Sequence, residues 1–245
     1  MSSRRSFLTA GAGSLLAATG VRAAKPTFAF PYSEFEACIA RREFREINRD
    51  VLPTPCMVVD LDIFEKNLKV MGDHVLSSGI KLRPHVKVHK SLDVAKRQIA
   101  LGAIGVTTAT IAESELMSGG GIKGVLWTKQ PASANNLARA ITLTRKDPTF
   151  MFVIDDPVVQ KWVEEAADEA KVKCRVVVSV NAGMLRQGIQ NGQPALELAQ
   201  KMASSKHMSF EGDMAYTGNA AHTHGWEARR KKSADDLLGF RKHCN

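Results

Sequence analysis

The stretch that decides the fold of this chain is Leu82-Arg83-Pro84-His85-Val86-Lys87-Val88-His89-Lys90-Ser91. A β-strand points successive side chains to opposite faces, so the stretch divides into an apolar face and a nitrogen-rich face. The apolar face holds Leu82, Pro84, Val86 and Val88, and the nitrogen-rich face holds Arg83, His85, Lys87 and His89. This pattern predicts a buried strand that carries a lysine to its end and then continues into a helix, where barrel enzymes hold their reactive groups.

Lys87 is the candidate reactive group. Because His85 and His89 flank it, the charged form of the amine is disfavoured, and an uncharged amine can attack a carbonyl carbon to form a Schiff base. The same spacing also fits solvated lysines at Lys87 and Lys90, with the two histidines as polar residues at the edge of a loop. The residues alone therefore leave both interpretations open.

The rest of the chain alternates regularly between short apolar runs and amphipathic segments. We predict strands at 56–60, 82–87, 105–110, 124–129, 149–155, 173–181 and 208–217. We predict helices at 61–78, 91–102, 112–117, 134–144, 157–171 and 193–204. Strands that alternate with single helices indicate a parallel sheet, and the lack of a Gly-rich dinucleotide turn after the first strand favours a barrel. We expect an incomplete α/β fold of the TIM type, a parallel (β/α)8 barrel with about six of its eight strands.

Two further segments place polar residues after predicted strands. Arg186 lies between Gly183 and Gly188, and Tyr216 and His222 follow the last predicted strand. Taken alone, these residues also fit ordinary roles: an arginine in a Gly-rich loop, a packed tyrosine and a solvated histidine. A His-x-His pair at His222 and His224 could supply two ligands to a metal ion, although no further ligands are evident.

Three motifs resemble those of the D-threonine aldolase and D-serine dehydratase family, whose barrel is similar to the N-terminal domain of alanine racemase. They are Arg83-Pro84-His85-Val86-Lys87-Val88-His89-Lys90 with the preceding Thr54–Asp60, the segment Gly183–Gly188, and the segment Tyr216–His222. The resemblance spans Thr54 to about Arg230 and implies a fold type III enzyme that uses pyridoxal 5'-phosphate. Such an enzyme acts on a β-hydroxy D-amino acid by aldol cleavage or dehydration, and racemisation is a related possibility.

The resemblance also implies roles for individual residues. Lys87 would form the Schiff base with the cofactor, Arg186 would bind its phenolic oxygen, and Tyr216 and His85 would complete its site. His222 would relay the proton of the substrate hydroxyl, a task that suits a side chain titrating near neutral pH.

The chain departs from the family pattern in three ways. Val88 stands where the family commonly has threonine, and Asn181 stands where it usually has an acidic residue. The family also has a C-terminal β-domain with a metal site, and we expect this chain to lack it. A divalent metal is therefore expected by resemblance, but this chain is expected to supply none of its ligands.

The N-terminus predicts export. Residues 1–24 combine Arg4 and Arg5 with an uncharged run and a small-x-small site, the layout of a twin-arginine signal peptide. We expect a periplasmic protein, with a lead-in at 25–53 and a partial alanine racemase-like barrel at 54–245.

The charge balance argues against nucleic acid as a partner. The net charge of +9 falls to +5 beyond residue 25, because residues 1–25 contain four cations and no acid. The one dense basic run, Arg229–Lys232, lacks interleaved aromatic residues and is expected to form a solvated helix face. We expect a small-molecule D-amino acid substrate, no membrane association after signal removal, and, by family analogy, a homodimer.

Three alternatives to this enzyme stay open at this point. The chain could be a non-catalytic pyridoxal-phosphate carrier with a similar barrel and lysine. It could be a metal-dependent barrel hydrolase that uses His222 and His224. It could also be an inactive fragment.

Overall fold

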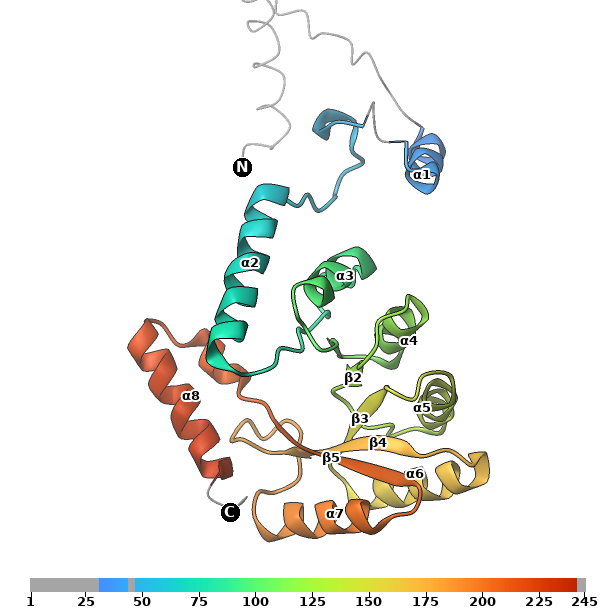
Figure 1. Cartoon of the computed structure of the whole chain (residues 1–245), viewed down its shortest axis with the longest axis vertical. Helices are drawn as coiled ribbons and strands as arrows, with labels where there is room; N and C mark the ends of the chain where they lie inside the picture. The colour runs from blue at the N-terminus through green and yellow to red at the C-terminus, as the bar shows by residue number, and fades with distance from the viewer. Residues whose placement is uncertain (1–30, 44–46, 242–245) are drawn as a thin grey trace, which may run out of the picture. The chain divides into compact units, whose positions relative to one another are not determined.

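The computed structural model describes residues 31–43 and 47–241 (Figure 1). The chain divides into two compact units, Met1–Asp60 and Leu61–Asn245. The first unit contains helix α1 (Tyr32–Arg41) and the short 3-10 helix η1 (Arg49–Val51). Within the described ranges, no helix combines the length and the apolar character that crossing a bilayer requires. The predicted signal peptide lies outside the described residues.

The second unit is built on a parallel sheet of five strands. They are β1 (Thr107–Thr108), β2 (Leu126–Trp127), β3 (Met151–Ile154), β4 (Cys174–Val180) and β5 (Met208–Ala215). Each strand pairs with the next one along the chain, in the order β1-β2-β3-β4-β5. Sequential order with parallel pairing is the topology of a (β/α) barrel rather than of a doubly wound sheet, as the sequence predicted.

A helix lies between each pair of successive strands, and two more precede the first (Figure 1). The helices are α2 (Leu61–Ser78), α3 (Leu92–Ala100), α4 (Ile111–Gly119), α5 (Ala134–Lys146), α6 (Pro157–Ala170), α7 (Gln193–Ser204), the 3-10 helix η2 (Gly218–His222) and α8 (Trp226–Arg241). Ser91 caps α3 as predicted, because its hydroxyl accepts a hydrogen bond from the backbone N–H of Val94 at 3.3 Å. The basic run Arg229–Lys232 lies on α8, and Lys231 and Lys232 there pair with Asp235 and Asp236.

The core lies on both faces of the sheet. Phe152 and Ile154 point outward and are buried against the helices, in one cluster with residues of α5, α6 and α7. Met151 and Val153 alternate with them and pack on the inner face with Leu126 and Val177. A sheet buried on both faces holds the strands in a fixed register, which positions whatever follows their carboxyl ends.

The stretch 82–87 runs beside β1 as a further parallel segment. Thr107 N–H donates to the carbonyl of Pro84 at 2.7 Å, and Val86 N–H donates to the carbonyl of Thr107 at 2.9 Å. Val86 is fully buried, as expected for the apolar face. Val88 corrects the prediction: it is 80% exposed, because the extended backbone ends at Val86 and residues 87–89 form a turn.

The predicted strand at 56–60 is also wrong. The structure assigns no strand to these residues, which belong to the first unit and are exposed. An extended segment becomes a strand only when a neighbouring backbone pairs with it, and within the described ranges no strand pairing involves 56–60.

Gly105 and Gly124 bring the chain segments before β1 and β2 into close contact. A Cβ atom at Gly105 would lie 2.1 Å from the carbonyl oxygen of Gly124, and Gly105 has a φ of +150°. Only glycine fits this position, because any side chain would collide with backbone that cannot move freely.

We predict that Gly105→Ala lowers the free energy of unfolding by about 1–3 kcal/mol or more, because the added Cβ overpacks the contact and strains the backbone. Urea denaturation of the purified chain measures the change. Gly119→Ala is the control, since nothing lies within 4 Å of a Cβ placed there. Equal midpoints for the two variants would contradict this account of the close contact.

Candidate functional site

A cavity of about 450 Å³ opens at the carboxyl ends of the strands. Its lining residues are His85, Lys87, Thr107, Ala109, Thr128, Lys129, Arg186, Gln187, Met214, Ala215 and Tyr216. These residues follow or end the 82–86 segment and strands β1, β2, β4 and β5, so the parallel sheet brings together residues distant in sequence. None of these described residues carries a carboxylate, whereas three carry a cation.

Tyr216 forms the aromatic wall between two of these cations. The Nζ atom of Lys87 lies 5.7 Å from the centroid of the Tyr216 ring, and the guanidinium carbon of Arg186 lies 4.9 Å from it. Both distances fall within the range of a cation–π interaction. Lys87, Arg186 and Tyr216, which the sequence placed on three separate motifs, therefore meet in one cavity.

His85 lines the same cavity and contacts the backbone of Lys87. Its Nδ1 atom accepts a hydrogen bond from the backbone N–H of Lys87 at 3.3 Å. Partial burial and the nearby charge of Lys87 lower the pKa of His85 below its ordinary value. The ring is therefore neutral at pH 7, and since Nδ1 is the acceptor, the proton lies on Nε2.

The loop that carries Arg186 is held by side chains on both sides of it. The Oδ1 atom of Asn181 accepts hydrogen bonds from the N–H groups of Gly183 at 2.9 Å and Leu185 at 3.2 Å. Gly188 donates its N–H to Asp155 at 2.7 Å. A Cβ atom at Gly188 would meet backbone atoms of Val180 and Asn181 at 2.5 Å. Asn181 thus supports the loop although it is not acidic, and Gly188 cannot be replaced without moving it.

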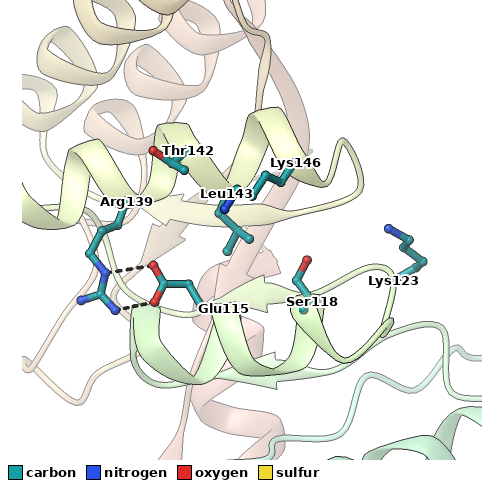
Figure 2. A pocket seen from close by; sticks show the side chains of 8 residues that line it. Glu115, Ser118, Lys123, Arg139, Thr142, Leu143 and Lys146 are labelled. Carbon is teal, nitrogen blue, oxygen red and sulfur yellow. Dashed lines mark hydrogen bonds and ion pairs between the residues drawn. The ribbon is translucent and has the colours of Figure 1, made fainter.

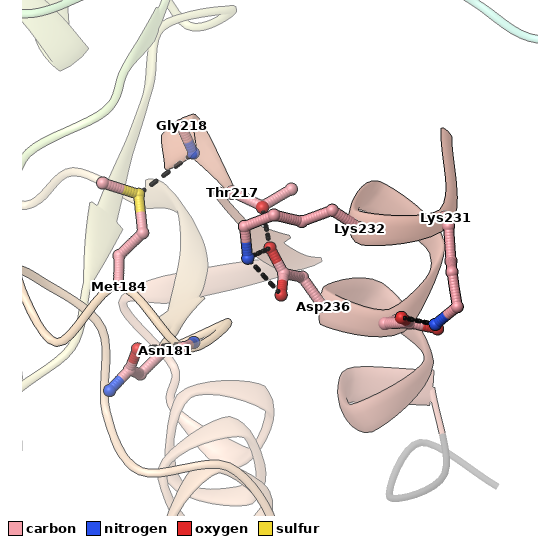
Figure 3. A network of polar contacts seen from close by, with 9 residues as sticks. Asn181, Met184, Thr217, Gly218, Lys231, Lys232 and Asp236 are labelled. Atoms are coloured by element: carbon pink, nitrogen blue, oxygen red, sulfur yellow. Dashed lines mark hydrogen bonds and ion pairs between the residues drawn. The ribbon is translucent and has the colours of Figure 1, made fainter. Parts of the chain in front are cut away.

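The segment after Tyr216 is fixed by contacts with two other parts of the chain (Figure 3). The N–H of Gly218 donates to the sulfur of Met184 at 3.0 Å, which ties this segment to the Arg186 loop. The hydroxyl of Thr217 donates to Asp236 on α8, and Lys232 binds the same carboxylate at 3.1 Å. A Cβ at Gly218 would lie 2.5 Å from the Tyr216 hydroxyl, so the small residue leaves room for the ring.

His222 is the last residue of η2, where it is exposed and does not line the cavity. His224 follows it and is exposed as well. Across the part of the chain that the structure describes, no three His, Cys, Asp or Glu side chains form a group able to hold a metal ion. The geometry around His222 and His224 therefore gives no support to a metal-dependent hydrolase.

Sequence reasoning missed Lys129, which lines the cavity and donates a hydrogen bond to Gln187. Partial burial is the main cause that lowers the pKa of Lys129, and the charges of Arg186 and Lys87 lower it further. The charge of Asp155 acts in the opposite direction. Lys129 ends the predicted strand 124–129, in the same position relative to its strand as Lys87. That placement at a carboxyl end is the signal that could have identified it.

A second hollow, of about 390 Å³, lies on the outer layer between α4 and α5 (Figure 2). Figure 2 shows Arg139 and Glu115 facing each other there, with a two-pronged ion pair at 2.9 and 2.5 Å. Lys123 in the same hollow lies 3.4 Å from the buried carboxylate of Asp147. Arg139 and Lys123 in this hollow therefore already have carboxylate partners, and Glu115 places a carboxylate in its lining, unlike the first cavity.

Comparison with known proteins places the geometry in context. Residues 59–243 match the family model described as the alanine racemase N-terminal domain. The chain is 34% identical over 185 residues to a 3-hydroxy-D-aspartate aldolase of Paracoccus denitrificans, covering 74% of this chain and 47% of that protein. It is 31% identical over 176 residues to a D-threonine aldolase of an Arthrobacter species, covering 72% of this chain and 46% of that one.

A solved structure supports the same likeness. The crystal structure of D-threonine aldolase from Filomicrobium marinum matches with a TM-score of 0.76 and 31% identity, over 80% of this chain and 52% of that one. The chain thus spans about half the length of the relatives it matches. The predicted fold class, a parallel α/β barrel similar to the N-terminal domain of alanine racemase, is confirmed.

We predict that His85 makes the stability of the chain depend on pH. Its pKa in the folded chain lies below the unfolded value of about 6.5, so the unfolded chain takes up the proton first as pH falls. The free energy of unfolding should therefore decrease on acidification from about pH 7.5 to about pH 5.5, and less so in His85→Gln. Urea midpoints at both pH values measure this. His74→Gln, at an exposed position on α2, is the control; a pH dependence that is unchanged in His85→Gln would contradict the prediction.

Proposed function

Because the chain belongs to the family of the alanine racemase N-terminal domain, we propose that it is the barrel part of a pyridoxal-phosphate enzyme that cleaves β-hydroxy D-amino acids. The observation that carries the proposal is the convergence of Lys87, Arg186 and Tyr216 on one cavity that no described carboxylate lines. A primary amine, a permanent cation and an aromatic face are the groups that an anionic aromatic aldehyde requires.

The donor set fits this cofactor. Lys87 would bond to the aldehyde carbon, and Arg186 would hold the phenolic oxygen in its ionised form, since a guanidinium does not titrate. Tyr216, 39% exposed and already in contact with both cations, would pack against the ring. When bound, the cofactor supplies an electron sink that weakens bonds to the substrate carbon attached to its nitrogen.

His85 and the loop residues orient these groups. The neutral His85 accepts the backbone N–H of Lys87 at Nδ1, which fixes the end of the strand from which the lysine extends. Asn181 and Gly188 hold the loop that carries Arg186, so the arginine needs little ordering when a ligand binds.

Within this proposal, His222 accepts the proton of the substrate hydroxyl. Its residue type suits the role because imidazole exchanges protons near neutral pH. η2 joins it to the segment of Tyr216, but His222 lies outside the cavity lining, so the substrate hydroxyl would have to extend toward η2.

Aldol cleavage is the reaction we favour over dehydration. The relatives named in both sequence comparisons above are aldolases, and so is the solved structure. In this reaction the Cα–Cβ bond breaks, the hydroxyl proton passes to a base, Cβ becomes a carbonyl carbon and Cα takes up a proton to give glycine.

Three further features belong to the proposal. A divalent metal is expected from the resemblance, with ligands from outside the described residues. Export by the twin-arginine route would place the protein in the periplasm, and the active form would be a homodimer. Fractionation of cells that express the full chain and light scattering of the purified protein test the last two.

The experiment is a product assay on the chain loaded with pyridoxal phosphate, with D-threonine and 3-hydroxy-D-aspartate as substrates. We expect glycine to form, and Lys87→Arg to abolish its formation, because a guanidinium keeps the charge but cannot bond to an aldehyde. Lys90→Arg is the matched control, because Lys90 lies on the same segment and pairs with Glu113 at 3.6 Å. His222→Ala should slow cleavage about 100-fold or more without changing cofactor loading.

Each other outcome has a definite meaning. Release of ammonia and a 2-oxo acid in place of glycine would show dehydration and overturn the aldolase proposal. Equal turnover in Lys87→Arg and the unaltered chain would remove Lys87 from the reaction. Cleavage that His222→Ala leaves unchanged would assign the hydroxyl proton to another group.

A further inference from the structure

We propose that Lys129 binds a second carboxylate on the substrate and so selects acidic β-hydroxy D-amino acids. The inference rests on the proposed function and extends it to a residue with no role so far. Lys129 follows β2 and lines the cavity together with Lys87 and Arg186.

Lys129 is a cation without a carboxylate partner in the cavity. Its Nζ atom donates to the side-chain oxygen of Gln187, which is neutral. Among the ion pairs that the described residues form, none involves Lys129. The amine is held in position by an amide, and its charge is not compensated by a direct ion pair.

The cofactor would occupy the other two cations. Lys87 would be joined to the aldehyde carbon and Arg186 would face the phenolic oxygen. In the cofactor-loaded chain, before substrate binds, Lys129 would then be the remaining cation in a cavity that no described acidic residue lines, since His85 is neutral. The carboxylate of Asp155 acts on Lys129 and accepts the N–H of Gly188, but it does not line this cavity, and no ion pair among the described residues joins it to Lys129. A cation without a direct ion pair in such a cavity favours an anionic group on the ligand.

The phosphate of the cofactor could be that group, but the position of Lys129 favours the substrate. On the pyridine ring the phenolic oxygen and the phosphate arm flank the aldehyde carbon on opposite sides. Lys129 donates a hydrogen bond to Gln187, the residue next to Arg186, and it lines a neighbouring hollow together with Arg186 but not with Lys87. Lys129 therefore lies on the phenolic side. Barrel enzymes usually bind phosphate in the loops after the last two strands, whereas Lys129 follows β2.

The substrate amine would take the place of the Lys87 amine on the aldehyde carbon, which releases Lys87 as a free amine, and the substrate would then lie between these two sides. Every amino acid substrate has a carboxylate on Cα, and an acidic β-hydroxy amino acid has a second one on Cβ. With that second carboxylate the cleavage described above yields glycine and a 2-oxo acid with an aldehyde group. A lysine on the phenolic side supplies a positive charge for the second carboxylate. D-Threonine has no second carboxylate and would not use this charge.

The test measures binding without turnover. D-Aspartate and D-alanine differ by the second carboxylate, and neither has the hydroxyl that aldol cleavage requires. Their dissociation constants for the pyridoxal-phosphate-loaded chain are measured by calorimetry and by the change in cofactor absorbance. We expect the unaltered chain to bind D-aspartate about tenfold or more tightly than D-alanine, the preference that one ionic hydrogen bond provides.

Lys129→Gln should reduce this preference about tenfold while D-alanine binding stays unchanged, which also shows that the variant folds. Lys129→Arg should retain most of the preference. Lys161→Gln is the matched control on the exposed face of α6, where the lysine side chain is 76% exposed, and should retain all of it.

The alternatives give different results. If Lys129 binds the cofactor phosphate, Lys129→Gln will weaken binding of pyridoxal phosphate but not of pyridoxal, and the D-aspartate preference will persist; this overturns the inference. If the cofactor attaches to Lys87 and the preference is the same in all variants, the inference fails and the proposed function stands. If the unaltered chain does not attach the cofactor at Lys87, both fail together.

Discussion

The parallel pairing of strands in sequential order is the constraint on which the rest of the structure depends. Because each strand pairs with the next and all run the same way, their carboxyl ends lie along one edge. Burial of both sheet faces, by Phe152 and Ile154 outside and Met151 and Val153 inside, fixes the register. Residues separated by more than 100 positions, such as Lys87 and Tyr216, can therefore meet within 5.7 Å.

The positive charge of the cavity has two causes: three cations line it, and no described carboxylate does. Elsewhere in the described chain, several cations pair with carboxylates, as Arg139 does with Glu115 and Arg175 with Glu211. In the cavity the cations face an aromatic ring and an amide instead. The positive charge is thus available to a ligand. Hydrogen bonds accepted by Asn181 and Asp155 hold the loop that carries Arg186.

The features of the fold that depend on neighbouring residues in the sequence could be predicted from the sequence. The bounds of α2 and α7, the cap at Ser91 and the strand–helix alternation follow from periodicity and turn residues. Strand pairing is not local, which is why 56–60 was wrongly expected to be a strand and why Val88 was placed on a buried face. Motif resemblance identified Lys87 and Arg186, whereas Lys129 belongs to none of the quoted motifs and emerged only from its position at a strand end.

The central claim is that Lys87 is the residue that holds the cofactor. The most direct test is to load the purified chain with pyridoxal phosphate, reduce it with borohydride and map the modified lysine by peptide mass spectrometry. The account predicts one adduct, on Lys87, and none in Lys87→Arg. Labelling confined to Lys129, or scattered over exposed lysines and unchanged in Lys87→Arg, would contradict it.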